Sequence, residues 1–177
     1  CQDAYSTLSE ATDARGRKLK LHKLCMPKQR VTIQGDFAID SVEGTGIDTF
    51  VLDDGWFGKR DSDTSSLGDY SVNAKKLPNG LKGLGEKLNA MGLQFGLWFE
   101  PESVSPDSEL YRRHPDWALH DSLGRTDLLG RHQLLLDLTK REVRDYIVKS
   151  VGGILDSAPI SYVKWDMNRH SCALGAK

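Results

Sequence analysis

The feature that most limits the folds open to this chain is a regular alternation of short apolar segments and longer helical ones after its first quarter. Apolar, β-branched and aromatic runs at 48–52, 93–99 and 161–167 predict strands, and the segments 79–91 and 140–155 between them have helical spacing. Connections of this length allow neighbouring strands to lie parallel, because a parallel pair needs a crossover of roughly a dozen residues or more. The sequence therefore predicts an α/β fold built on a parallel sheet.

Weaker patterns occupy the remaining length. We expect Asn79 to cap the first helix and Gly92 to end it. Shorter elements are predicted as a strand at 30–34, a helix at 106–114, and strands at 116–120 and 133–138. Residues 1–30 are polar and have no apolar stripe to bury, so we expect a poorly specified leader there, followed by one domain over 31–177.

Four of the predicted strands end in side chains suited to a functional site, most of them carboxylates. In chain order they are Asp53 and Asp54; Trp98, Glu100 and Glu102; Asp137; and Lys164, Asp166 and Asn168. A (β/α)8 barrel gathers the carboxyl ends of its strands on one face, so groups distant in sequence meet there. A doubly wound sheet shows the same alternation but normally carries a glycine-rich phosphate turn after its first strand, and the glycines at 80–85 lie inside a predicted helix instead. We therefore expect the first half of a (β/α)8 barrel, incomplete at the C-terminus.

The last predicted strand carries the densest group of such side chains. Alternation puts Lys164, Asp166 and Asn168 on one face of a strand expected to be buried, with Trp165 and Met167 on the other. A neighbouring ammonium lowers the pKa of a carboxylate and keeps it ionised, as a nucleophile requires. A structural ion pair at a strand end is the alternative for an isolated Lys-x-Asp, but the repetition at earlier strand ends favours a site. Carboxylates and amides bind hydroxyl groups and indole rings stack on sugars, so the set suits a polyhydroxylated ligand.

Composition argues against several other kinds of partner. The 24 Lys and Arg residues nearly balance the 25 Asp and Glu residues, so a net charge of -1 gives no electrostatic reason to expect nucleic acid or an anionic membrane. No run of about 18 apolar residues is present to span a bilayer. The cysteines Cys1, Cys25 and Cys172 are odd in number and fit no zinc spacing, which favours free thiols in a reducing compartment and hence a cytoplasmic protein. Because the first residue is not Met, we expect a piece of a longer product.

Six motifs then point to one enzyme family. They are Phe50-Val-Leu-Asp-Asp-Gly-Trp-Phe-Gly58, Leu77-Pro-Asn-Gly-Leu81, Gly96-Leu-Trp-Phe-Glu-Pro-Glu102, His114-Pro-Asp-Trp117, Gly130-Arg-His-Gln-Leu134 and Lys164-Trp-Asp-Met-Asn-Arg169. From about residue 47 to residue 169 the chain thereby resembles glycoside hydrolase family 36, the α-galactosidases, with the motifs in family order. Residues 1–30 do not resemble the family.

The resemblance implies a retaining glycosidase that removes terminal α-galactosides from oligosaccharides of the melibiose and raffinose type, with no metal and no organic cofactor. It assigns Asp166 as the nucleophile. The substrate-binding residues that it implies are Asp53, Asp54, Trp98 as a subsite wall, Arg131, Lys164 and Asn168. In the family the second carboxyl, which acts as acid and base, comes from a later strand. We therefore expect this chain to be inactive by itself and its open sheet edge to promote association; a homo-oligomeric parent protein is compatible with this.

Three alternatives remain open from the sequence. A transglycosidase that passes galactose to another sugar would share every motif. A non-catalytic sugar-binding fragment is favoured by the missing second carboxyl. A metal-dependent barrel enzyme would use Asp53, Asp54, Glu100 and Glu102 as oxygen ligands, but Lys164 would lie in that site and no histidine falls at a strand end.

Overall fold

The computed structural model describes residues 11–12, 18–19, 48–120 and 132–169. The chain divides into two compact units, one of residues 1–31 and 36–47, the other of residues 32–35 and 48–177. In the first unit β1 (Ala11–Thr12) and β2 (Lys18–Leu19) pair antiparallel. The strand predicted at 30–34 lies outside the described residues.

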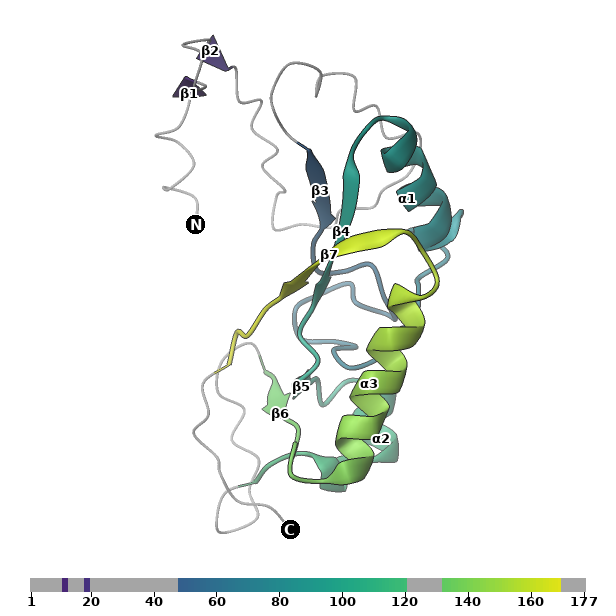
Figure 1. Ribbon diagram of the computed structural model, residues 1–177. Helices are drawn as coiled ribbons and strands as arrows, with labels where there is room; N and C mark the ends of the chain where they lie inside the picture. Colours follow the sequence, from purple (N-terminus) through teal and green to yellow (C-terminus); the bar gives the residue numbers. More distant parts are fainter. Residues whose placement is uncertain (1–10, 13–17, 20–47, 121–131, 170–177) are drawn as a thin grey trace. The chain divides into compact units, whose positions relative to one another are not determined.

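The second unit is built on a parallel sheet with the strand order β3–β4–β7 (Figure 1). Its strands are β3 (Thr49–Leu52), β4 (Gln94–Phe99) and β7 (Ile160–Trp165). Both pairings of the central strand β4 are parallel, and every residue of β4 after its first is buried. The α/β class and the parallel sheet predicted from the alternation are therefore confirmed.

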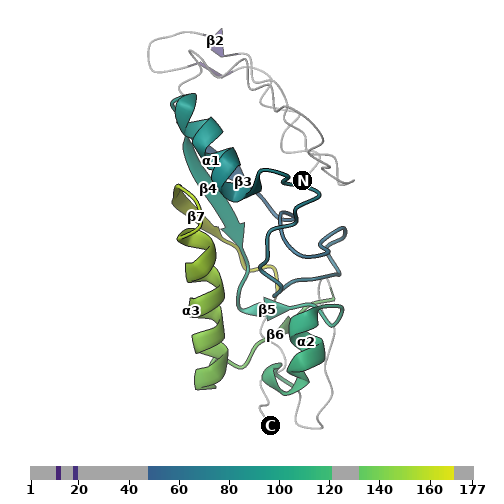
Figure 2. The same cartoon turned by 90° about the vertical axis from the view of Figure 1, so that its right-hand side faces the viewer.

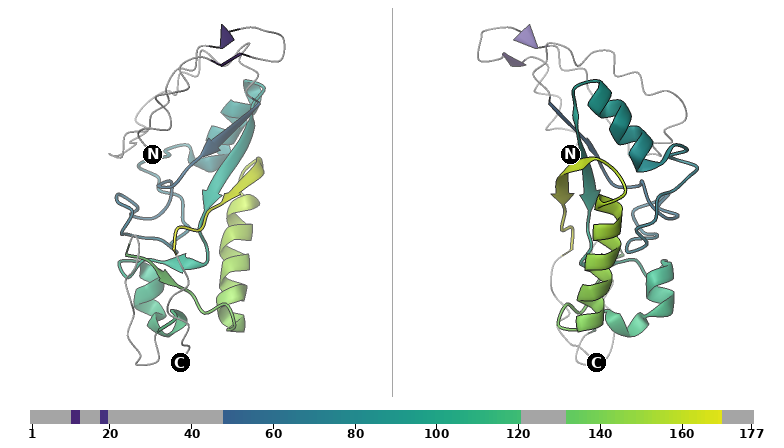
Figure 3. Two further views of the ribbon diagram at one scale, coloured as in Figure 1. Left: turned by 90° about the vertical axis from the view of Figure 1, so that its left-hand side faces the viewer. Right: turned by 45° about the vertical axis from the view of Figure 1, so that its right-hand side comes forward.

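The crossovers are the helices α1 (Gly80–Ala90) and α3 (Arg141–Leu155), which lie along the same face of the sheet (Figures 2 and 3). The apolar stripe of α1 buries Leu81 and Leu88, and that of α3 buries Val143. Both helices begin and end close to the predicted limits, because their apolar spacing matches the 3.6-residue turn. Among the described helices, none has the length and apolarity that crossing a bilayer requires.

The sequence predicted a capping residue at the start of α1 and a glycine stop at its end. Asn79 stands at the N-cap position with φ -95° and ψ 9°, and its side chain makes no capping hydrogen bond. Asn79 thus occupies the predicted N-cap position, but its backbone is not the extended one from which a capping side chain normally accepts a helix N–H. At the other end Gly92 has φ +78°, and the Leu93 N–H donates to the Leu88 carbonyl at 3.0 Å. The predicted glycine stop is confirmed.

Between β4 and α3 the chain forms short elements beyond the carboxyl ends of the strands. They are β5 (Ser103–Val104), α2 (Glu109–Arg113), a 3-10 helix (Pro115–Trp117) and β6 (Leu134–Leu135). β5 and β6 pair antiparallel, a sheet that the sequence did not predict. Figure 2 shows this group below the parallel strands.

Several predicted limits in this region were wrong. The strand expected at 116–120 is mostly absent, because Pro115 starts a 3-10 turn and the residues after it pair through isolated bridges, such as that between Ala118 and Leu136. The strand expected at 133–138 keeps only the two residues of β6. The helix expected from residue 106 starts later, because the Ser108 hydroxyl accepts the Tyr111 N–H at 3.0 Å and caps α2 there.

The last strand also differs from its prediction. β7 ends at Trp165: the Asp166 N–H still donates to the Phe99 carbonyl at 2.8 Å, but the next N–H, of Met167, turns to the Asp166 side chain. The strand was expected to be buried, and it is not, since Tyr162 is 51% and Trp165 58% exposed. In the described sheet β7 has a partner on one side only, which leaves these rings uncovered.

Buried aromatic rings fill the space under the ends of β3 and β4. They belong to Trp56, Phe57, Tyr70, Trp98 and Phe99. Phe57 stacks on Trp98 with ring centroids 6.1 Å apart and planes 7° from parallel. The Trp56 indole donates to the Trp98 carbonyl at 3.0 Å, which ties the loop after β3 to β4. This packed floor fixes the positions of the polar side chains above it.

Gly85 of α1 offers a test of helix-to-turn packing. A Cβ at Gly85 would meet the Pro159 ring at 2.8 Å and Phe95 at 3.0 Å, whereas a Cβ at Gly152 of α3 meets nothing within 4 Å. Alanine normally stabilises a helix relative to glycine. We expect Gly152→Ala to stabilise the chain slightly and Gly85→Ala to be less stable than that control by about 1–3 kcal/mol, the usual cost of overpacking. Urea unfolding of both variants measures the difference, and equal gains in stability would contradict the close packing.

Candidate active site

The charged residues singled out in the sequence converge at the carboxyl ends of the three parallel strands. Asp53 and Asp54 directly follow β3, Glu100 follows β4, Lys164 is the penultimate residue of β7, and Asp166 follows it. Carboxyl ends of parallel strands share one edge of a sheet, so the strand order alone brings these groups together. The contacts below show how closely they meet.

Asp166 accepts three hydrogen bonds. Its Oδ2 accepts the Trp98 Nε1–H at 3.1 Å and an Asn168 Nδ2–H at 2.8 Å, and its Oδ1 accepts the Met167 N–H at 3.0 Å. Partial burial raises its pKa, but these donors together with the Lys164 charge outweigh the burial, so the pKa of Asp166 lies below its ordinary value. Asp166 is therefore ionised at neutral pH and held in one orientation.

Lys164 bridges the two outer strands of the sheet. Its Nζ donates to Asp53 Oδ2 at 2.7 Å, across the end of the central strand. Both side chains are close to half exposed, 42% and 46%, so a ligand can reach them. Because Lys164 also acts on the pKa of Asp166, the pair and the nucleophile candidate form one electrostatic unit.

Asp54 has a partner that the sequence reasoning missed. The Arg60 guanidinium binds both of its carboxylate oxygens, with Nε at 2.9 and 3.2 Å and Nη2 at 2.8 Å, and its Nη1 donates to the Ser65 carbonyl at 2.9 Å. The Arg60 side chain is 1% exposed and that of Asp54 25%. A fork-like pair of this kind fixes the plane of the carboxylate. Arg60 lies in a polar loop, where a local pattern gives no signal of such a role.

Two of the three tryptophans near the site are buried, and the third is exposed. Trp98, assigned by resemblance to a subsite wall, is 1% exposed, and its indole N–H points at Asp166. Trp56 lies in the aromatic floor. Trp165 is exposed, and its Nε1–H donates to Glu102 Oε2 at 2.9 Å.

The pKa of Glu102 is raised by its burial and by the charges of Glu100 and Asp166. Its hydrogen bonds to its own backbone N–H and to Trp165 act in the opposite direction.

Glu100 and Asn168 form a buried link beside Asp166. Glu100 is fully buried, and its carboxylate accepts the backbone N–H of Asn168 at 2.8 Å and the side-chain amide of Asn168 at 3.0 Å. Gln133 from the segment before β6 donates to the same carboxylate at 3.2 Å. Sequence reasoning placed Asn168 among the ligand-binding residues and left Glu100 as either a supporting or a solvated group, so this link was missed.

Asp137 and Arg131 are the two remaining candidates. Asp137 is buried, and its Oδ1 accepts the backbone N–H and the hydroxyl of Thr139, which fixes the turn before α3. Arg131 lies outside the described residues. Within 48–120 and 132–169, no three His, Cys, Asp or Glu side chains are arranged to hold a metal ion.

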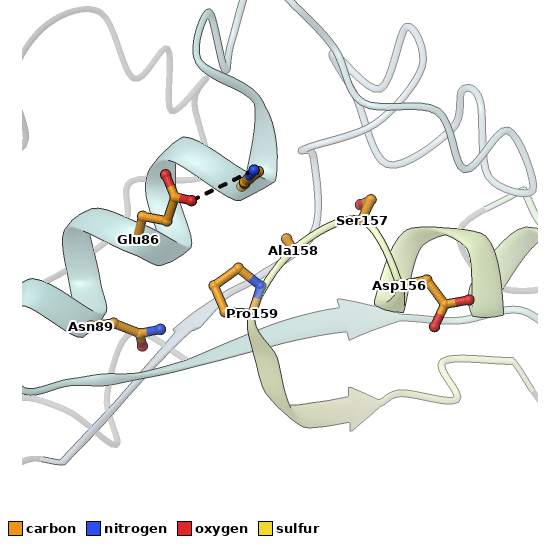
Figure 4. Close-up of a pocket in the computed structure, with 7 residues that line it drawn as sticks. Glu86, Asn89, Asp156, Ser157, Ala158 and Pro159 are labelled. Carbon is orange, nitrogen blue, oxygen red and sulfur yellow. Dashed lines mark ion pairs between the residues drawn. The ribbon is translucent and has the colours of Figure 1, made fainter.

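A hollow of about 390 Å³ lies away from these groups (Figure 4). It is lined by Glu86 and Asn89 of α1 and by residues 156–159, the turn that leads into β7. This turn precedes the start of β7, whereas Asp166 follows its end. The hollow therefore belongs to the opposite end of the sheet and takes no part in the site.

Comparisons with known proteins show which sequences this chain is similar to. A family model described as Melibiase matches residues 33–177. Alpha-galactosidase AgaA of Geobacillus stearothermophilus is 60% identical over 131 residues, 74% of this chain and 18% of that protein. Alpha-galactosidase Mel36A of Lactobacillus acidophilus is 51% identical over 131 residues, again 74% of this chain and 18% of that protein.

Solved structures give the same result in three dimensions. The crystal structure of a variant of the GH36 alpha-galactosidase AgaA from Geobacillus stearothermophilus in complex with raffinose matches with a TM-score of 0.71 and 59% identity. The match covers 74% of this chain and 18% of that one. The chain thus spans less than a fifth of the length of these relatives.

Proposed function

Since the chain belongs to the Melibiase family, and its relatives are α-galactosidases of glycoside hydrolase family 36, we propose that it supplies the nucleophile and part of the galactose-binding site of a retaining α-galactosidase. The observation that carries this proposal is Asp166, an ionised carboxylate fixed by three donors at the end of β7 beside the Lys164–Asp53 pair. A nucleophile needs a charged and oriented oxygen, and this arrangement provides one.

The proposed reaction has two steps. An oxygen of Asp166 attacks the anomeric carbon as the bond from that carbon to the leaving oxygen breaks, and a second carboxyl group protonates the leaving oxygen. Water then releases galactose from the glycosyl ester, and the second carboxyl takes up a proton from that water. Glu100 is committed to Asn168. In line with the resemblance to the family, in which the second carboxyl comes from a later strand, we assign that role to a later strand of the barrel.

For the substrate we propose terminal α-galactosides such as raffinose. The AgaA structure that matches this chain is a complex with raffinose. Asp53, Asp54 and Lys164 are partly exposed charged groups at the strand ends, and such groups form strong hydrogen bonds with sugar hydroxyls. Lys164 and Asp53 hold each other, and Arg60 holds Asp54, before the sugar arrives.

We further propose that residues 31–177 correspond to the first half of a (β/α)8 barrel. The support is the parallel order β3–β4–β7, with both crossover helices on one face, as in a barrel whose helices form the outer layer. In that arrangement the uncovered edge of β7 would receive the next strand.

A chimaera tests the function. Residues 48–169 of this chain replace the corresponding segment of the Geobacillus stearothermophilus α-galactosidase AgaA, which is 60% identical. We expect the chimaera to hydrolyse raffinose and aryl α-galactosides but not aryl α-glucosides, and proton NMR to show α-galactose as the first product. A folded but inactive chimaera, or β-galactose as first product, would contradict the proposal. Transfer to an added sugar in preference to water would instead identify a transglycosidase.

A further inference from the structure

We propose that Glu100 is a positioning residue for Asp166, acting through Asn168. This deepens the proposed function, on which it rests for the role of Asp166. The chain of contacts runs from the end of β4 to the segment after β7: Glu100 holds Asn168, and Asn168 holds Asp166. Neither step involves a residue of the Lys164–Asp53 pair.

Glu100 is fully buried, and hydrogen-bond donors of the protein occupy both of its carboxylate oxygens. It is 0% exposed, and its two oxygens accept from the Asn168 backbone, the Asn168 amide, Gln133 and, at 3.4 Å, the Ser103 hydroxyl. A carboxylate buried in a protein interior is costly unless donors satisfy it. All four contacts are donors, as an acceptor-only carboxylate requires. Glu100 therefore has no oxygen left for a sugar hydroxyl.

The Asn168 amide is oriented by its two acid neighbours. An amide nitrogen carries two hydrogens, and here one points to Glu100 Oε2 at 3.0 Å and the other to Asp166 Oδ2 at 2.8 Å. A rotation that exchanged the amide oxygen and nitrogen would place an oxygen against two carboxylates. Glu100 thereby ensures that Asp166 receives a donor. The amide hydrogens of Asn168, a residue assigned to substrate binding from the sequence, are used within the protein.

The effect on Asp166 is selective between its oxygens. Oδ2 accepts two side-chain donors, from Trp98 and Asn168, whereas Oδ1 accepts the backbone N–H of Met167. The two donors on Oδ2 restrict rotation of the carboxylate. Without Glu100, the Asn168 amide would be free to turn away and one of these restraints would be lost.

The direction in which Glu100→Gln changes the pKa of Asp166 separates a positioning role of Glu100 from a purely electrostatic one. Among the described residues, the Lys164 charge acts on Asp166, the Asp166 charge acts on Glu102, and Glu100 lies on the other side of the Asn168 amide that both carboxylates accept from. Removing a nearby negative charge lowers the pKa of a carboxyl group, but losing a hydrogen-bond donor raises it. Glu100→Gln does both, and its new amide hydrogens would also face the donors of Asn168. Glu102→Gln removes a charge without touching Asn168 and serves as the matched control.

The experiment follows the carboxyl carbon resonance of Asp166 by NMR during pH titration of the full chain. We expect Glu100→Gln to raise the pKa of Asp166 and Glu102→Gln to lower it. In an Asn168→Ala background, Glu100→Gln should no longer raise it, because the connecting amide is gone. A lower pKa of Asp166 in the Glu100→Gln single variant, or the same rise with Asn168→Ala present, would overturn the proposal.

Hydrogen exchange of the Asn168 side chain needs no variant, and it tests the proposal even where Glu100→Gln does not fold. Both side-chain amide protons of Asn168 should exchange slowly with solvent in the unaltered chain, since each is bound to a carboxylate. Rapid exchange of either proton would overturn the proposal. These readouts do not involve hydrolysis, so an inactive chimaera would remove the proposed function without affecting them. In an active chimaera, Glu100→Gln should lower kcat by about tenfold, the typical effect of one hydrogen bond to a charged group, with KM little changed.

Discussion

Asp166→Asn in the chimaera is expected to lower the turnover of an aryl α-galactoside by about 10³-fold or more, because an amide cannot form the glycosyl ester. The variant should fold normally. Asparagine is nearly isosteric with aspartate, and its carbonyl oxygen can still accept from Trp98 and Asn168 in place of Oδ2. The measurement is release of the aryl group under initial-rate conditions, with circular dichroism to check the fold.

The matched control for this substitution is Asp156→Asn. Asp156 is exposed in the turn before β7, at the other end of the strand, and the same chemical change there should leave turnover unaltered. Added azide or formate should restore part of the activity of Asp166→Asn, since a small anion can attack where the carboxylate is missing. Retention of a tenth or more of the control rate without such an anion would remove Asp166 from the nucleophile role, given the size of the loss expected from a missing nucleophile.

The parallel sheet was predictable from sequence because its determinants are local. The apolar run ending at Leu52 and the run ending at Phe99 each show strand periodicity over a few residues, and the spacing between them admits a helix. The Lys164–Asp53 contact then follows from topology, since both residues lie at carboxyl ends of strands in one sheet. The same reasoning applies to Asp166.

What could not be predicted depends on contacts between distant segments. β5 and β6 are only two residues each and lack any periodic signal; their pairing joins Ser103 to Leu135. From the sequence, Glu100 could be a group that supports the site or a solvated one, and only the approach of Asn168 and Gln133 makes it a buried acceptor. The apolar residues of β7 predicted a buried strand. The exposure of its side chains depends instead on which strands lie beside β7. Composition alone does not contain that information.

Arg60→Met is expected to lower the free energy of unfolding of the chain by about 2–4 kcal/mol, because it leaves the Asp54 carboxylate without its bidentate partner. Methionine fills part of the arginine volume and supplies no donor. It also leaves the Ser65 carbonyl without the contact at 2.9 Å that Arg60 now provides. The Asp54 side chain is 25% exposed, so water replaces some of the lost hydrogen bonds. The loss should therefore fall below that of a fully buried pair.

Lys59→Met is the control, since it removes the adjacent exposed cation and should change the stability by less than about 0.5 kcal/mol. Combining Arg60→Met with Asp54→Asn should recover part of the loss in stability, because the carboxylate charge that lacks a partner is then gone.

In the chimaera, Arg60→Met should also raise KM for raffinose, because the Asp54 carboxylate loses the guanidinium that sets its plane. Equal stabilities of the Arg60→Met and Lys59→Met chains in urea unfolding would show that the pair contributes nothing to the loop. The orientation of Asp54 would then have to come from the sugar itself.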